Sequence, residues 1–108
     1  MQINIHNLNQ MINGWFVGDF ENSALRTKDF EVAVKFYKAG DMEGRHVHQI
    51  ATEITVILHG QVKMCGQVLQ HGDIITLKPG ESTAFEAITD VTTVVVKTPS
   101  VIGDKYVL

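Results

Sequence analysis

The chain has 108 residues, of which 44% are hydrophobic and 19% charged, so we expect one globular domain and no extended disorder. Its net charge of −3 comes without any basic block, which argues against nucleic acid and anionic membranes as partners. The only cysteine, Cys65, excludes an internal disulfide and favours a reducing, cytoplasmic location.

The first 29 residues are expected to form an edge or arm segment beside the main body. They begin with MQINIHNLNQM, which has no basic region followed by an apolar run, so we expect no secretory signal. The next part, HNLNQMINGW, is compatible with one helical turn before Gly14 or with an edge segment. We expect Trp15 and Phe16 to pack this segment over a sheet or across a dimer interface.

Between residues 30 and 98, short runs rich in β-branched residues alternate with turn glycines, which is typical of an antiparallel sandwich or barrel. In the run FEVAVKFYKAG, alternate side chains form two sets: Val32, Val34 and Phe36 on one face, and Ala33, Lys35 and Tyr37 on the other. Alternation alone leaves open which set faces inward. Further strands are expected, in chain order, in HVHQ, EITVILHG, DIITLKPG, TAFEAIT and TTVVVKTP.

Two other segments complete the expected pattern. The run QVKMCGQVLQHG predicts a tight hairpin with Cys65 and Gly66 near its turn. The closing TPSVIGDKYVL is expected to pack as an edge strand or tail, and we assign no chemistry to it. No apolar run in the chain reaches the length that a membrane span requires.

Two histidines and a glutamate in one short segment are the strongest chemical signal. His46 and His48 are two positions apart on an expected strand, so they project from the same face. A neighbouring antiparallel strand that carries Glu53 brings a carboxylate to the same place. Two imidazoles and one carboxylate suit Fe(II), Mn(II), Ni(II), Co(II) or Zn(II), and they leave positions for a substrate or water. The alternative is a hydrogen-bonded polar cluster that binds no ion.

Gly40 and Gly60 flank these residues, so the segment reads G-x5-H-x-H-x4-E-x6-G. This spacing resembles the first motif of the cupin superfamily, and chance agreement is on the order of 10⁻⁷ per starting position. The resemblance implies an all-β, cupin-type double-stranded β-helix (jelly-roll) barrel of the small cupin-2-like kind. Residues 1–108 would form a single domain, with its core at about 30–98. The resemblance also implies that His46, His48 and Glu53 line the barrel mouth as metal ligands.

The second cupin motif, G-x5-P-x-G-x2-H-x3-N, is matched only in part by GDIITLKPGESTAFEA, residues 72–87. Gly72 and Gly80 agree with it, whereas Lys78, Thr83 and Ala87 stand at its proline, histidine and asparagine positions. Members of the family that bind metal often use three histidines and a glutamate. The resemblance therefore implies that Thr83 occupies the place of a fourth ligand.

This departure at Thr83 leaves three alternatives open. The centre has two histidines and one carboxylate with three open positions, or another residue supplies the fourth ligand, or the metal binds weakly or not at all. Strand alternation argues against Glu86 as a substitute, because it points away from the face that carries Thr83. Glu81 has the right parity but falls in a turn. His6, His59 and His71 are expected on the surface.

We therefore predict a small metal-binding cupin, a divalent-metal-dependent enzyme that acts on a small polar, carbohydrate or keto-type molecule. The alternatives are a non-catalytic sugar-binding module and an accessory barrel with a weakened or vestigial metal site. No catalytic residue is assigned, and the candidates for proton transfer are Tyr37, Glu81 and Thr83. We also expect a homodimer, because a small barrel of this kind has open sheet edges to cover.

Overall fold

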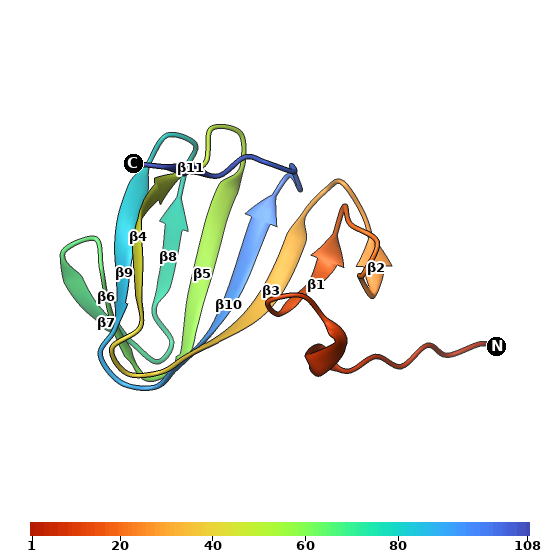
Figure 1. Cartoon of the computed structure of the whole chain (residues 1–108), viewed down its shortest axis with the longest axis horizontal. Coiled ribbons are helices and arrows are strands. Elements are labelled where there is room, and N and C mark those ends of the chain that lie inside the picture. The colour runs from red at the N-terminus through yellow and green to blue at the C-terminus, as the bar shows by residue number, and fades with distance from the viewer.

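The computed structural model describes all 108 residues, and its strands form two sheets that face each other (Figure 1). Sheet A contains β1 (Trp15–Gly18), β2 (Leu25–Arg26), β3 (Glu31–Tyr37), β5 (Thr52–His59), β8 (Ile74–Leu77) and β10 (Val91–Thr98). Sheet B contains β4 (Met42–Val47), β6 (Gln61–Met64), β7 (Gln67–Gln70), β9 (Ser82–Ala87) and β11 (Tyr106–Val107). The strand orders are β2-β1-β3-β10-β5-β8 and β11-β4-β9-β6-β7. The prediction of an all-β jelly roll is confirmed.

The N-terminal residues contain the only helical turn, η1 (Leu8–Gln10), which is a 3-10 turn. Asn7 caps it, because its side chain accepts the Asn9 N–H while the Gln10 side chain accepts the Asn7 N–H. The residues before this turn extend away from the two sheets (Figure 1). No helix in the structure is long and apolar enough to cross a membrane.

Gly14 allows β1 to join sheet A. Its φ is +81°, and a side chain there would overlap the Val34 carbonyl oxygen, so only glycine fits this close approach. The Val34 N–H donates to the Gly14 carbonyl at 3.1 Å, and Trp15 is paired with Ala33 of β3. The indole of Trp15 is therefore carried on the edge of the sheet beside β3.

The hydrophobic core fills one end of the space between the sheets. Its buried members come from β5, β6, β9 and the start of β10: Ile57, Val62, Met64, Phe85, Ala87 and Val91. Tyr37 of β3 packs against this cluster, with ring centroids 4.4 Å from Phe85. The inward set on β3 is therefore Ala33, Lys35 and Tyr37, because they share the parity of Tyr37.

Two turns with positive φ flank β6, and the one at Gly60 closes the core end. The β6–β7 hairpin has φ of +52° at Cys65 and +70° at Gly66, as in a two-residue turn whose central residues both have positive φ, so the predicted hairpin is confirmed. Gly60, which follows β5, has φ of +88°, and a side chain there would overlap the Asp90 carbonyl oxygen. The opposite end of the barrel contains the β4–β5 loop and the C-terminal residues, and the polar residues gather there.

Candidate metal centre

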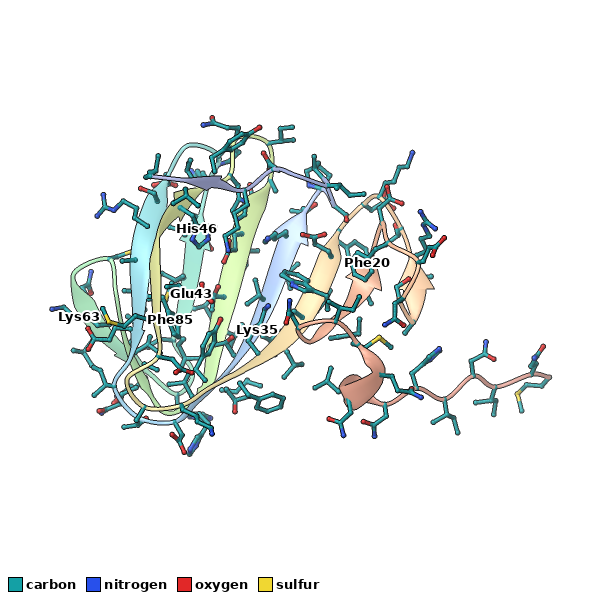
Figure 2. The ribbon with its side chains drawn as sticks, viewed as in Figure 1. Phe20, Lys35, Glu43, His46, Lys63 and Phe85 are labelled. Atoms are coloured by element: carbon teal, nitrogen blue, oxygen red, sulfur yellow. The ribbon has the colours of Figure 1, made fainter.

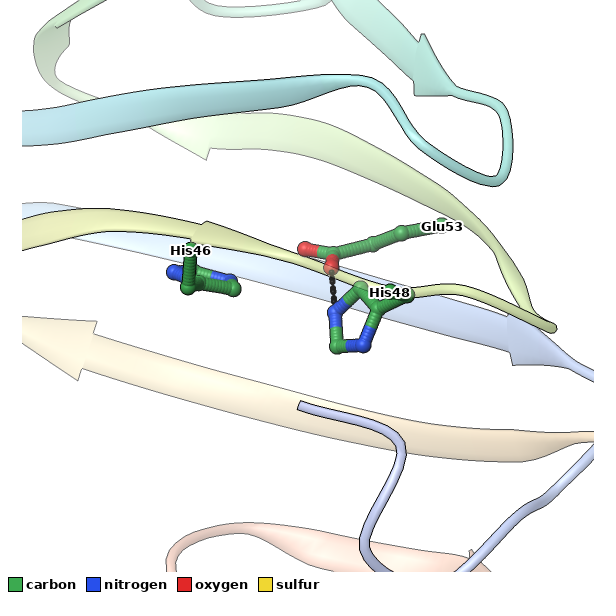
Figure 3. A group of neighbouring side chains, drawn as sticks. All are labelled: His46, His48 and Glu53. Carbon is green, nitrogen blue, oxygen red and sulfur yellow. Dashed lines mark hydrogen bonds and ion pairs between the residues drawn. The ribbon is translucent and has the colours of Figure 1, made fainter. Parts of the chain in front are cut away.

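The three predicted ligand residues come together at the end of the barrel away from the core. His46 lies on β4, His48 directly follows β4, and Glu53 is near the start of β5. One ligand atom from each lies within 4.8 Å of the others, and Figure 3 shows the group. His48 Nε2 is 2.7 Å from Glu53 Oε2. The segment that predicted the group therefore does bring its side chains to one place.

Both imidazole rings are oriented by backbone carbonyl groups. His48 Nδ1 lies 2.8 Å from the Asp104 carbonyl oxygen, and His46 Nδ1 lies 3.3 Å from that of Gly44. A carbonyl only accepts hydrogen bonds, so this pattern assigns the proton to Nδ1 in each ring. Nε2 then carries the lone pair in the neutral form, which is the arrangement that metal-binding histidines show.

His48 and Glu53 form a buried charged pair. The hydrogen bond to Glu53 raises the pKa of His48; burial opposes this, and the Asp104 carbonyl adds to it. For Glu53, burial alone would raise the pKa, but the hydrogen bond from His48 and the positive charge of Lys97 outweigh burial and lower it. His48 is only 5% exposed. The carboxylate is thus held in its ionised form, as a metal ligand requires.

The C-terminal segment holds the loop that carries His48. The Asp104 carboxylate accepts the backbone N–H groups of Gln49, Ile50 and Ala51 at 2.9 to 3.2 Å. Burial alone would raise the pKa of Asp104, but these three donors lower it. The predicted edge strand is present, because β11 pairs with β4. The sequence assigned no chemistry to this segment, and the structure places Asp104 in direct contact with His48 and its loop.

A β-bulge in β4 adds Glu43 to the site. The pairing of β4 with β9 shifts between Glu43 and His46, so the two side chains face the same side although they are three residues apart. The Tyr37 hydroxyl donates to Glu43 Oε1 at 3.0 Å. Burial, followed by the charge of Glu43 and this hydrogen bond, raises the pKa of Tyr37 well above its usual range. Figure 2 shows Lys35 on β3 and Glu43 and His46 on β4.

Thr83 is directly opposite His46 in the β4–β9 pairing and is 6% exposed. Its hydroxyl accepts the Cys65 N–H and donates to the Ala84 carbonyl, both at 2.8 Å. Backbone groups therefore use its proton and one of its two lone pairs, and a neutral hydroxyl is a poor metal ligand beside imidazole. The two other candidates lie elsewhere: Glu81 is in the β8–β9 turn, where it accepts the Lys78 N–H, and Glu86 has the opposite parity on β9.

A row of charged side chains crosses sheet A beside the histidines. Lys97 of β10 pairs in register with Glu31 of β3 and with Glu53 of β5. Its ammonium lies 3.6 Å from Glu31, and its side chain is 16% exposed. The Nζ atoms of Lys97 and Lys35 lie 4.8 and 5.0 Å from the centre of the Trp15 ring. The sequence left the orientation of these lysines open, and the structure turns both toward the site.

Solved structures with the same architecture include a double-stranded β-helix protein from Klebsiella pneumoniae, with a TM-score of 0.72, 20% identity and coverage of 95% of this chain and 89% of that one. An RmlC-like cupin from Shewanella frigidimarina matches with a TM-score of 0.61 and 17% identity over 68% of each chain. The chain has the cupin fold. The DMSP lyase DddQ from Ruegeria pomeroyi shares this cupin architecture, with a TM-score of 0.64 and 22% identity over 81% of this chain but 45% of the lyase. Neither a scan of family models nor a search of curated proteins finds a match.

The donor set of this chain fits a divalent metal ion. A metal ion about 2.1 Å from each ligand atom holds neighbouring ligand atoms about 3.0 to 3.5 Å apart, so small side-chain rotations suffice from the present spacing. Both Nδ1 atoms are bound by carbonyls, and His48 Nε2 faces the Glu53 carboxylate. Two histidines and one carboxylate form a set that leaves coordination positions for a substrate. The identity of the metal is not fixed by these three residues.

Proposed function

We propose that this cupin is a divalent-metal-dependent enzyme for a small polar molecule. The observation that carries the proposal is the convergence of two imidazoles and one carboxylate, whose ligand atoms lie within 4.8 Å of one another, with His48 Nε2 directed at Glu53. His46, His48 and Glu53 would hold the ion. A bound ion would polarise a carbonyl or hydroxyl oxygen of the substrate, or activate O2. The similarity in fold to a DMSP lyase is compatible with an enzyme but selects no reaction.

The chain's own residues would orient the substrate and handle protons. The Tyr37 hydroxyl, which donates to Glu43, is part-buried, lines the same small space as His46 and Glu53, and carries its proton at neutral pH. Glu43 accepts the hydrogen bond from this hydroxyl and so orients the phenol. Tyr37 is therefore our candidate for proton donation, in preference to Glu81, which lies in a turn, and Thr83, whose hydroxyl bonds to the backbone.

The satisfied hydroxyl of Thr83 also favours one of the alternatives for the centre. With no fourth protein ligand beside His46, we infer a face of two histidines and one carboxylate with three positions left for substrate and water. This arrangement supports catalysis better than a closed structural site does, because a structural ion has all its positions filled by protein.

Metal analysis tests the proposal. We expect protein purified without chelator to contain about one divalent ion per chain, and we expect His46→Ala and His48→Ala to lose it. The matched control is His71→Ala, because His71 is exposed in the turn after β7. Circular dichroism verifies that the variants fold. The proposal fails if metal-free protein keeps the same thermal midpoint with Fe(II), Mn(II), Ni(II), Co(II) and Zn(II).

We also propose that two copies pair through the outer face of sheet A. On β3, β10, β5 and β8 this face carries only uncharged side chains, among them Phe36 and Ile74, which are 69% and 65% exposed. A face without charge is complementary to itself under two-fold symmetry. Four strands of up to eight residues span roughly 19 by 26 Å, so two copies would bury about 1,000 Å², the lower limit for a specific interface. The exposed Ile3 and Ile5 of the N-terminal segment are available to extend it.

A further inference from the structure

One hydroxyl inside the barrel has no partner in the protein. Thr93 of β10 is 1% exposed, and its Oγ1 is the only buried side-chain oxygen or nitrogen that makes no hydrogen bond within the chain. Its neighbours on the same face of the strand are Val91 and Val95, so a valine, which has the same shape, would continue the pattern. A buried hydroxyl without a partner costs free energy. The threonine is therefore explained best by a partner that is not a protein group.

Thr93 lines a small space inside the barrel, with a volume of about 30 Å³. The other polar or charged residues of its wall are Tyr37, Glu43, His46, Glu53, Thr55 and Thr83. His48 is not part of the wall, whereas Phe85 and Met64 of the core are, so the space extends from the candidate metal centre toward the core. A space of this volume admits a water molecule and is about ten times smaller than a pocket for an organic ligand.

Two carboxylates of this wall each have one oxygen without a hydrogen bond in the protein. Glu43 accepts the Tyr37 hydroxyl through Oε1, and Glu53 binds His48 through Oε2. Figure 3 shows the other Glu53 oxygen pointing away from His48. Together with the Thr93 hydroxyl, the two free oxygens make three polar partners, and a buried water binds two to four. Carboxylates only accept hydrogen bonds, so their ligand must donate hydrogens. A water does this, whereas O2 or an anion does not.

We propose that this space is the binding site of a single water molecule, which the Thr93 hydroxyl holds against the free oxygens of Glu43 and Glu53. Thr93 is then a positioning residue, because it fixes the water and contacts no substrate. The site stands on the unpartnered hydroxyl, the size of the space and the two free oxygens, and it requires no metal. Its consequence is a proton route, since the water connects the Tyr37–Glu43 pair with Glu53. Only this route rests on the proposed function.

Crystal structures and thermal unfolding of the metal-free protein test the water site. An ordered oxygen should lie within about 3.2 Å of Thr93 Oγ1 and should be absent in Thr93→Val. This variant should also lower the thermal midpoint by about 4 to 8 °C, because the free oxygens of Glu43 and Glu53 lose the water. If no water is bound, the same variant should instead raise the midpoint, because it removes an unsatisfied group without a change of shape. A raised midpoint, or no ordered oxygen beside Thr93, would overturn the site. Density at the shorter contact distances of a cation would overturn it as well.

Two control variants separate the water from the packing. Thr76→Val makes the same change at an exposed position of β8 and should leave both the midpoint and the bound water unchanged. Thr93→Ser loses the methyl group but keeps the hydroxyl, so it should keep the water.

The proton route has a readout of its own. Exchange of the Tyr37 hydroxyl proton with solvent, followed by NMR, should be slower in Thr93→Val than in Thr93→Ser. Equal exchange rates would overturn the route. A protein that holds the water but takes up no metal would support the water site and overturn only the proposed function.

Discussion

Strand β3 directs Glu31, Ala33, Lys35 and Tyr37 toward the inside of the barrel, and its remaining side chains toward the outside. The strands beside it repeat the contrast. Lys97 and Glu53 face inward, while the outer face of sheet A is built from Val32, Val34, Phe36, Ile54, Val56, Leu58, Ile74, Val94 and Val96 with threonines between them. One end of the inner face is therefore charged, and the outer face is apolar.

This arrangement is the reverse of what the hydrophobic effect alone favours. Burying charged groups costs free energy, and so does exposing apolar side chains to water. The other end of the same inner face follows the usual rule, with Ile57 and Val91 in the core. We infer from this difference that stability comes from the core end, and we propose binding at the charged end and association through the outer face. Each part of this comparison leads to a test.

The largest expected effect follows from placing a charge on the outer face. In Phe36→Lys, a dimer formed through sheet A would bury two unpaired ammonium groups, one per copy. At roughly 2 kcal/mol each, this raises the dimer dissociation constant about 1,000-fold. Analytical ultracentrifugation should show the unmodified protein at twice the chain mass and the variant at the chain mass, with metal content unchanged.

The control is Ala84→Lys, which adds the same charge to an exposed position of β9 on the other sheet and should leave the mass unchanged. An unmodified protein that sediments as a monomer at all concentrations would disprove the pairing, and so would a Phe36→Lys variant that remains a dimer. In either case the uncharged outer face would need another explanation.

The strand pattern of β3 could be predicted from the sequence, but its orientation could not. Alternation separates Lys35 and Tyr37 from Val34 and Phe36, and the usual preference for apolar cores would turn the wrong set inward. The orientation of β3 follows from the packing of Tyr37 on Phe85. This contact joins the two sheets, so no local sequence pattern contains it. The fold itself was predictable, because the spacing around His46 and the turn glycines is local.

The metal residues could be predicted for the same reason, since His46, His48 and Glu53 lie within eight positions of one another. Glu43 was not predicted as a site residue, because strand alternation counted from His46 places it on the other face and only the bulge reverses this. The sole local hint is Gly44, next to it. Asp104 was not predicted as a site residue, because it lies 56 residues from His48 in the sequence. Contacts of that separation depend on the whole fold.

Asp104 holds the loop that follows His48, and its replacement should have the second largest effect. Asp104→Asn substitutes an amide NH2 for one of the two oxygens that bind backbone N–H groups, leaving at least one buried donor without a partner. We expect a loss of about 2 to 3 kcal/mol in the free energy of unfolding. Metal affinity, measured by calorimetry at neutral pH, should fall about 10- to 100-fold because the support of His48 is disturbed.

The pH dependence distinguishes the charge of Asp104 from its shape. Its folded pKa lies below the ordinary value of 3.8, so the carboxylate stabilises the fold fully above that value and loses this contribution as the pH falls through the lowered pKa. The stability difference between the two proteins should therefore shrink below about pH 4. The control is Asp41→Asn, an exposed turn carboxylate with one backbone donor. Equal losses in both variants would contradict a special role for Asp104.

The smallest expected effect is a gain in stability from Lys35→Met. Burial and the neighbouring lysines lower the pKa of Lys35, so the fold disfavours its charged form, and an apolar side chain of similar length should stabilise the protein by about 1 kcal/mol. The lowered pKa of Lys35 lies below its ordinary value of 10.5. The unmodified protein therefore gains stability as the pH rises from the lowered pKa to the ordinary one. The stability advantage of Lys35→Met should shrink over that pH range. Denaturant unfolding measures both.

Ligand binding should weaken in Lys35→Met while stability increases. If the charged end is kept for binding, the variant should be more stable and yet bind a ligand at that end more weakly, a trade-off typical of binding sites. Lys63→Met, on the exposed side of β6, should change the free energy of unfolding by less than about 0.5 kcal/mol and leave binding intact. A Lys35→Met variant that loses stability would mean that this lysine supports the fold through Glu43 and Trp15, and the charged end of the inner face would then be structural.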